Sequence, residues 1–164
     1  MIELSGLFGR DAQPFETSPD DDLVRSIESE LGRRLPRAYI ELARAHNGGY
    51  LTRSVHRADT PTTWAADRIA VTSIAAIGRT AAFSLGGEMG SRFWLEEWGY
   101  PDIGIHFADC PSAGHDMLAL DYRGGEEPTI VHVDQEAGYR ITTLAPDFAT
   151  FLNGLLHEAD FDNS

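Results

Sequence analysis

The sequence predicts an α+β fold: an N-terminal helix hairpin, a mostly antiparallel sheet of about five strands, and a C-terminal helix packed on one sheet face. Three observations predict it. Apolar residues recur at helical spacing near both ends, within 18–46 and 146–157. Short runs rich in β-branched and aromatic residues lie between them. The spacers 110–116 and 123–128 are too short for helical crossovers, so neighbouring strands should be antiparallel.

The first helix should begin at Ser18 and Pro19, because serine can cap a helix and proline suits its first position. The three aspartates that follow face the positive end of the helix dipole. Consecutive helical residues point about 100° apart, so these aspartates should not converge on a metal ion. Gly32 should end the helix, whose inward face would consist of Leu23, Val24, Ile27 and Leu31.

A second helix should begin at Pro36 and end at Asn47-Gly48-Gly49, residue types that tolerate left-handed backbone geometry. Its inward residues would be Tyr39, Leu42 and Ala43. The two helices should therefore form a hairpin.

The middle of the chain has the character of β-structure. A mobile excursion rich in Gly, Ala and Ser is expected over 78–90, followed by a short helix that Ser91 caps and Gly99 closes. A last helix over 146–157 should bury Phe148 and Phe151 against the sheet. The expected strands are 50–55, 68–77, 103–107, 117–122 and 129–133, with 139–142 as a further candidate.

One domain over 18–157 is expected, between an N-terminal arm of residues 1–17, laid on the domain or loose, and an acidic tail of residues 158–164. At 164 residues the chain is long enough to bury a core without metals or disulfides. Its start lacks the basic and apolar regions of a signal peptide, and no apolar run is long enough to span a bilayer. We expect a cytoplasmic monomer or weak dimer.

The charge of the chain excludes several kinds of chemistry. All 13 basic residues are arginines, against 26 acidic residues, which gives a formal net charge of −13. Without lysine the chain can form neither a Schiff base nor a Walker A phosphate loop. Its negative field serves solubility, repels nucleic acids and anionic membranes, and attracts basic proteins. We therefore expect a basic protein partner, no nucleic acid and no membrane.

Six histidines and a single cysteine raise the question of catalysis. His106, Cys110 and His115 form the closest grouping, and Asp109 or Asp116 would complete a zinc site for a metal-dependent hydrolase. In the structural alternative, His106 lies on a sheet face, Cys110 in a turn, and His115 holds a loop. The chain contains no Gly-x-Ser-x-Gly elbow. We predict no catalytic residue, no metal and no cofactor.

An aromatic cluster around Trp94 and Trp98 has two interpretations: it plugs the core, or it presents anchors to a partner. An exposed tryptophan among acidic residues would suit a basic protein. The candidate partner-binding residues are Trp94, Trp98, Glu96, Glu97, Asp102, Asp109 and Asp116.

Several motifs in order resemble the SUKH superfamily, specifically its Smi/Knr-like branch, which is related to the yeast cell-wall assembly regulators. They are Ile27-Glu28, Leu31-Gly32, Leu35-Pro36, Tyr39 and Asn47-Gly48-Gly49, followed by the segments 114–122, 128–133 and 148–155. The resemblance covers roughly residues 18–156. It implies an α+β fold with no catalytic residues. The positions carried over as structural are Leu35, Pro36, Tyr39, Asn47, Gly48, Gly49 and Asp121.

The resemblance also implies a binding role, because many bacterial members look like immunity proteins that neutralise nuclease toxins. Combined with the charge, it leads us to expect an acidic domain that binds a basic toxin domain and blocks its nucleic-acid-binding cleft. The alternative is a regulatory or scaffold interaction module of the cell-wall assembly regulator type. A metal-dependent hydrolase is the third hypothesis.

Overall fold

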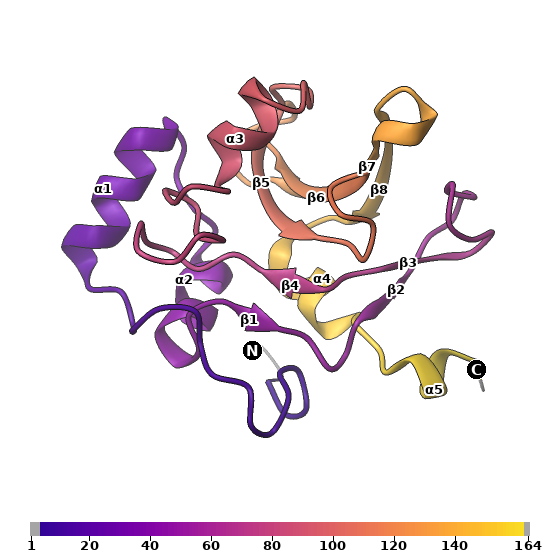
Figure 1. The fold of residues 1–164 in the computed structure, drawn as a ribbon, viewed down its shortest axis with the longest axis horizontal. Coiled ribbons are helices and arrows are strands. Elements are labelled where there is room, and N and C mark those ends of the chain that lie inside the picture. Colours follow the sequence, from indigo (N-terminus) through magenta and orange to yellow (C-terminus); the bar gives the residue numbers. More distant parts are fainter. Residues whose placement is uncertain (1–3, 163–164) are drawn as a thin grey trace.

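A computed structural model describes residues 4–162 and confirms the α+β fold, with helices first, a sheet next and helices last (Figure 1). All paired strands of the described part are antiparallel, as predicted. The main sheet has six strands, one more than expected. Their order in space is β1 (Gly49–Tyr50), β4 (Ser73–Ile74), β5 (Gly104–Asp109), β6 (Asp116–Asp121), β7 (Thr129–Asp134) and β8 (Arg140–Ala145).

The helix hairpin consists of α1 (Asp21–Leu31) and α2 (Arg37–Ala45). The cap of α1 is Asp20 rather than Ser18, because the Asp20 carboxylate accepts a hydrogen bond from the backbone N–H of Leu23 at 2.8 Å. The helix therefore begins two residues later than Pro19. Gly32 ends it in the left-handed conformation, as predicted.

The Asn47-Gly48-Gly49 corner joins the hairpin to the sheet and to the N-terminal arm. The Asn47 amide donates to the carbonyls of Thr17 and Ile77, at 2.8 and 3.0 Å, and its side-chain oxygen accepts from the Ile77 N–H. Gly48 has a φ of 75°, and a Cβ there would lie 2.7 Å from the backbone nitrogen of Ala76. The entry of the chain into β1 therefore requires both the side-chain amide of Asn47 and a glycine at position 48.

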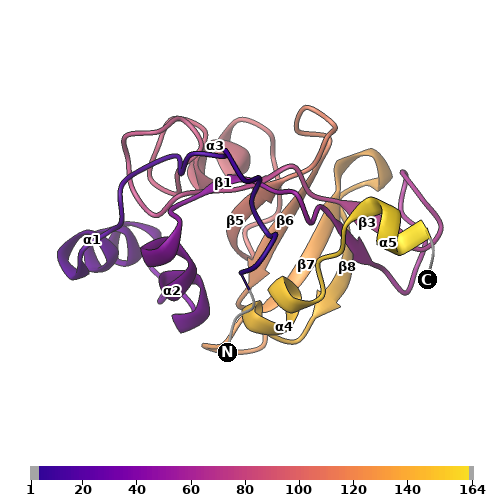
Figure 2. The same ribbon diagram turned by 90° about the horizontal axis from the view of Figure 1, so that it is seen from below.

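The main core lies between the helices and one face of the sheet. The Tyr39 hydroxyl donates to the carbonyl of Ala75 at 2.7 Å, and its ring stacks on Phe148 of α4 (Phe148–Asn153) at 4.7 Å. Figure 2 shows α4 against the sheet beside α2, which confirms the predicted packing of the C-terminal helix on one sheet face. Leu35 and Pro36 are buried here, and the Asp121 carboxylate accepts hydrogen bonds from Arg123.

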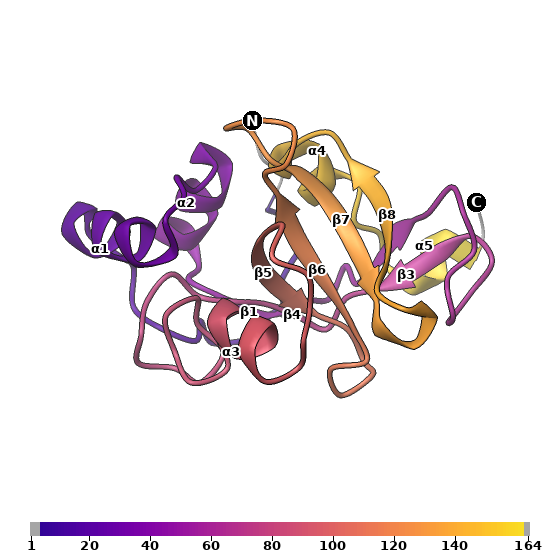
Figure 3. The same cartoon turned by 90° about the horizontal axis from the view of Figure 1, so that it is seen from above.

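The opposite face of the sheet carries a smaller core under α3 (Ser91–Glu96) (Figure 3). Residues of β6 alternate between the two cores: Leu118 and Leu120 face the main core, whereas Met117 and Ala119 face the smaller one. Every residue of β6 is buried, so this strand lies at the centre of the molecule.

Two expected strands are split by a bend. The segment 50–55 becomes β1 and β2 (Val55–Arg57), and the segment 68–77 becomes β3 (Arg68–Ala70) and β4. Strands β2 and β3 form a separate two-stranded sheet. Backbone hydrogen bonds from Leu51 to Thr72 and from Val71 to Ser54 continue the ladder around the bend, so the four strands form one bent hairpin.

The C-terminal region is also divided. The expected helix over 146–157 ends at Asn153, and after Gly154 the chain pairs with β2 through a bridge between Leu156 and Val55. A short helix, α5 (Glu158–Asp162), occupies most of the segment expected as an acidic tail. Its Phe161 ring lies under the guanidinium groups of Arg57 and Arg68. No helix in the part the structure describes is both long and apolar enough to cross a bilayer.

The segment 78–90 is anchored near its start to the N-terminal arm and to α1, rather than being a free excursion. Glu16 accepts hydrogen bonds from the N–H groups of Thr80 and Ala81, both at 3.1 Å. Arg79 pairs with Glu30 of α1 at 2.9 Å. These contacts hold the segment in place between the helix hairpin and α3.

Candidate functional site

An aromatic groove of about 550 Å³ opens between β1, the segment 78–90 and α3. It is lined chiefly by the side chains of Phe15, Tyr50, Phe83, Met89, Phe93 and Trp98, with Asp109 among them. Tyr50 is 62% exposed and Met89 is 40% exposed, so the rim is accessible to a partner. An exposed apolar surface of this kind marks a binding site more often than a scattered hydrophobic residue does.

Trp94 forms the floor of the aromatic groove. Its ring is 3% exposed, and its indole N–H donates to the carbonyl of Met89 at 3.0 Å. A Cβ at Gly114 would approach the rings of Trp94 and Trp98 to about 3 Å, so both rings pack directly on the backbone there. This packing places the floor of the groove directly against the turn between β5 and β6.

Asp109 supplies a partly buried carboxyl group to the groove. It accepts a hydrogen bond from the hydroxyl of Ser73 in β4. Burial raises the pKa of Asp109 above its usual value, although the hydrogen bond from Ser73 opposes this shift. A cation seated in the groove would stabilise the ionised carboxylate, so the site favours a positively charged group.

The structure separates the predicted partner-binding residues. Trp98 and Asp109 line the aromatic groove, and Glu96 and Glu97 are exposed at the end of α3, whose Phe93 lines it. Asp102 is exposed but lies in a different hollow, beside Arg33 and Arg92.

Two of the predicted partner-binding residues, Trp94 and Asp116, are buried. Trp94 is buried, because its ring fills the space under Met89 and against Gly114. Asp116 is also buried, because its side chain lies on the main-core face of β6, in line with Leu118. Asp116 is therefore not accessible to a partner, and Trp94 contributes only the floor of the aromatic groove.

Sequence analysis missed Phe15, Tyr50, Phe83 and Met89 as groove residues. They come from three segments far apart in the chain, each of which was interpreted as an arm, a strand or a loop. A single exposed aromatic at the start of a strand, such as Tyr50, carries no signal of the residues that it will meet. Only the antiparallel pairing of β1 with β4 brings Tyr50 next to Ser73, at the edge of the groove.

The histidines do not group as the zinc hypothesis required. The His106 ring packs against Tyr100, at 5.3 Å between ring centroids. His115 lies against Trp98 and pairs with Glu136 at 2.7 Å. Both rings pack against aromatic residues of the smaller core and its border, whereas Asp116 faces the main core, so His106, His115 and Asp116 do not form one metal site.

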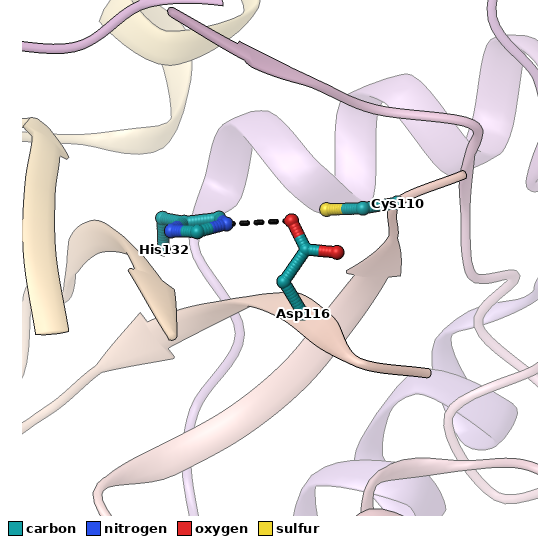
Figure 4. Close-up of side chains that lie close together, drawn as sticks. All are labelled: Cys110, Asp116 and His132. Atoms are coloured by element: carbon teal, nitrogen blue, oxygen red, sulfur yellow. Dashed lines mark hydrogen bonds and ion pairs between the residues drawn. The ribbon is translucent and has the colours of Figure 1, made fainter. Parts of the chain in front are cut away.

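The structure instead brings Cys110 and Asp116 together with His132, which sequence analysis did not connect with them. The Nε2 atom of His132 lies 2.7 Å from Oδ2 of Asp116, with the Cys110 sulfur beside the carboxylate (Figure 4). His132 is in the middle of β7, and antiparallel pairing with β6 places it on the same face as Asp116. Burial, and then the neighbouring Asp116, raises the pKa of the Cys110 thiol, so this cysteine is a poor nucleophile.

His106 provides a pH-dependent contribution to stability. The ring is fully buried, and burial lowers its pKa to about 4, while the Pro101 carbonyl and Asp102 oppose the shift. The unfolded chain takes up this proton near the usual histidine pKa, whereas the native state does so only near pH 4. The stability that neutral His106 contributes is therefore full above the usual pKa and is lost as the pH falls through about 4.

We predict that lowering the pH from 7 to 5 costs the wild type about 2 kcal/mol more unfolding free energy than it costs His106→Gln. Urea unfolding of both proteins at the two pH values measures this difference. The variant is the internal control, since all other titrating groups are shared. An equal loss in both proteins would contradict the prediction.

Comparison with known proteins identifies the family. A search of curated proteins finds no match. Among protein families, residues 18–154 match the SMI1 / KNR4 family (SUKH-1). The match runs from just before α1 to just after α4. It therefore includes the helix hairpin, both sheets, α3 and the buried residues Cys110, Asp116 and His132. The chain therefore belongs to the SMI1/KNR4 family (SUKH-1), as its motifs predicted.

Proposed function

We propose that this chain is a binding protein of the immunity type, which binds a basic nuclease toxin domain and blocks its nucleic-acid-binding surface. The aromatic groove with its partly buried Asp109 is the observation that carries the proposal. The resemblance to bacterial immunity proteins supports it, as does the net charge of −13. In this function the chain makes and breaks no covalent bond.

Charge and the groove have different parts in the proposed binding. The long-range negative field speeds the encounter with a basic surface, and this contribution weakens as salt is added. An arginine or lysine of the partner then enters the groove, where its stem contacts Met89 and Phe93 and its charge faces Asp109. Because this contact excludes water, it retains affinity at high salt.

The same chemistry explains how the toxin would be neutralised. A nuclease holds the phosphate backbone with basic side chains, so the groups that the groove and the acidic residues recognise are those that the nucleic acid needs. Occupying them prevents substrate binding. The inhibitor therefore has to reach only the basic surface and not the catalytic atoms.

We predict that Met89→Arg weakens binding of the nuclease domain by at least about 30-fold, which corresponds to about 2 kcal/mol. The change places a positive charge in the mouth of the groove. The ligand is a catalytically inactive basic nuclease toxin domain, titrated by calorimetry. The matched control is Trp64→Arg, since Trp64 is 54% exposed in the neighbouring hollow and not in the groove.

The charge contribution is tested separately. Replacing Glu96 and Glu97 with glutamine should slow association with the nuclease domain. The control is the same change at Glu126 and Glu127, an exposed pair in the turn between β6 and β7, which should slow association less. Equal binding of Met89→Arg and the wild type would refute the groove as the site. Tight binding without inhibition of the active nuclease would favour the scaffold module instead.

A further inference from the structure

Three different donor atoms meet in the main core: the sulfur of Cys110, a carboxylate oxygen of Asp116 and a ring nitrogen of His132. All three lie within 4.8 Å of one another, and all three residues are buried (Figure 4). Thiolate sulfur, carboxylate oxygen and imidazole nitrogen are the donors by which proteins bind zinc. We propose that this cluster binds one zinc ion, in a site that serves structure rather than catalysis.

The spacing of the donors suits a zinc ion after small movements. Zinc bonds of about 2.0 to 2.3 Å in a tetrahedral arrangement place the donor atoms about 3.3 to 3.7 Å apart. The His132 nitrogen and the Asp116 oxygen are 2.7 Å apart and share a proton. Replacing that proton with the ion requires these two atoms to separate by about 0.6 Å, and the more distant donors to approach by up to about 1 Å. Side-chain rotations supply movements of this size.

Unpaired buried oxygens support the presence of a cation. Within residues 4–162, Oδ1 of Asp116 and Oδ1 of Asp134 are buried and have no hydrogen-bond partner. Asp116 and Asp134 are directly paired in the β6–β7 register, so the two carboxylates lie on the same face of the sheet. Unsatisfied buried acceptors cost free energy, and a metal ion held by the cluster would satisfy the one on Asp116.

Asp134 is our candidate for the fourth ligand; it lies outside the group of donor atoms that are within 4.8 Å of one another, so its side chain would have to move towards the ion. Its other oxygen, Oδ2, accepts hydrogen bonds from the N–H and the hydroxyl of Thr63, at 2.9 and 2.6 Å. Hydrogen bonds of this kind orient a ligating carboxylate and leave its free oxygen directed at the metal. With Asp134 drawn in, Cys110, Asp116, His132 and Asp134 would give the ion four ligands and close its coordination.

The ion would connect three strands. Cys110 follows β5, Asp116 begins β6, and His132 and Asp134 belong to β7. The turn between Cys110 and Asp116 carries Ala113 and Gly114, which line the aromatic groove. The site would thus hold that edge of the groove in place. The proposal of a zinc site rests on this cluster alone and does not depend on the identity of the partner.

The single cysteine makes the proposal directly testable. Cobalt(II) replaces zinc in such sites, and a cobalt–thiolate bond gives an intense near-ultraviolet charge-transfer band. Because Cys110 is the only cysteine in the sequence, any such band in thiol-free buffer reports this residue. We expect wild-type protein to bind one cobalt ion with this band, to lose the band on adding zinc, and to retain one zinc per chain after dialysis, as measured by elemental analysis.

Variants identify the remaining ligands. Cys110→Ser should lose the charge-transfer band, and His132→Gln should weaken zinc binding by more than about 100-fold. Zinc at 100-fold excess over its dissociation constant should raise the melting temperature of the wild type by on the order of 5 °C, and that of Cys110→Ser far less. The matched control is His115→Gln, which replaces a histidine adjacent to Asp116 that bonds Gln135 and Glu136 instead.

The wild-type titration is decisive even if a variant fails to fold. A wild type without a charge-transfer band and without stoichiometric zinc would overturn the proposal. So would a His115→Gln protein that loses zinc binding as fully as His132→Gln, because the site would then lie on the other face of the sheet. Binding of the nuclease domain is a separate measurement, and its absence leaves the metal result unaffected.

Discussion

Gly48→Ala should destabilise the protein by about 4 kcal/mol. A methyl group at this position would lie 2.7 Å from the backbone nitrogen of Ala76, which cannot move without disturbing β4. The φ of 75° adds the cost of holding alanine in the left-handed region. The measurement is the unfolding free energy in urea, with circular dichroism confirming that the variant folds before the transition.

The control for this prediction is Gly124→Ala in the β6–β7 turn. No atom lies within 4 Å of a Cβ at Gly124, and its φ is outside the left-handed region. Its unfolding free energy should change by less than about 0.5 kcal/mol. Equal losses at Gly48 and Gly124 would show that the corner after α2 is not packed as described.

Trp94→Ala should cost about 4 kcal/mol of unfolding free energy, as removal of a large buried aromatic side chain does. The indole fills the smaller core under α3 and contacts the rings of Phe93, Trp98 and Tyr100. Its removal leaves a cavity and takes the hydrogen bond away from the Met89 carbonyl. Urea unfolding followed by circular dichroism measures the loss.

Trp64→Ala is the matched comparison, because Trp64 is 54% exposed. The same chemical change there should alter the unfolding free energy by less than about 1 kcal/mol. A small effect of Trp94→Ala would contradict the burial of its ring and reinstate Trp94 as a partner contact.

Local signals in the sequence were sufficient for the helix hairpin and the central strands. Gly32 ends α1 as predicted because a helix end depends on one residue and its neighbours. Strands β5, β6 and β7 are bounded by turn residues and were located to within a residue or two. The order of motifs then identified the family, which residues 18–154 confirm.

Features that depend on distant contacts were not predictable. At the bend between β1 and β2, Leu51 and Val71 bond to partners about twenty residues away, and no local pattern records this. After Gly154 the chain bonds to β2, about a hundred residues away in the sequence, through the bridge between Leu156 and Val55. The sequence around His132 does not indicate that this residue contacts Asp116, because the contact arises only from the pairing register of β6 and β7. The groove likewise requires the arm, the segment 78–90 and α3 to be assembled.

The N-terminal arm has a consequence for self-association. Strand β1 is an edge of the six-stranded sheet. The arm pairs with the chain on either side of it, through a bridge from Phe8 to Leu51 and another from Glu16 to Asn47. An uncovered sheet edge is a template on which a second molecule can add a strand, the first step towards amyloid-like aggregation. Because residues 8–16 bond to the backbone on both sides of β1, they hinder a second molecule from adding a strand at this edge of the sheet.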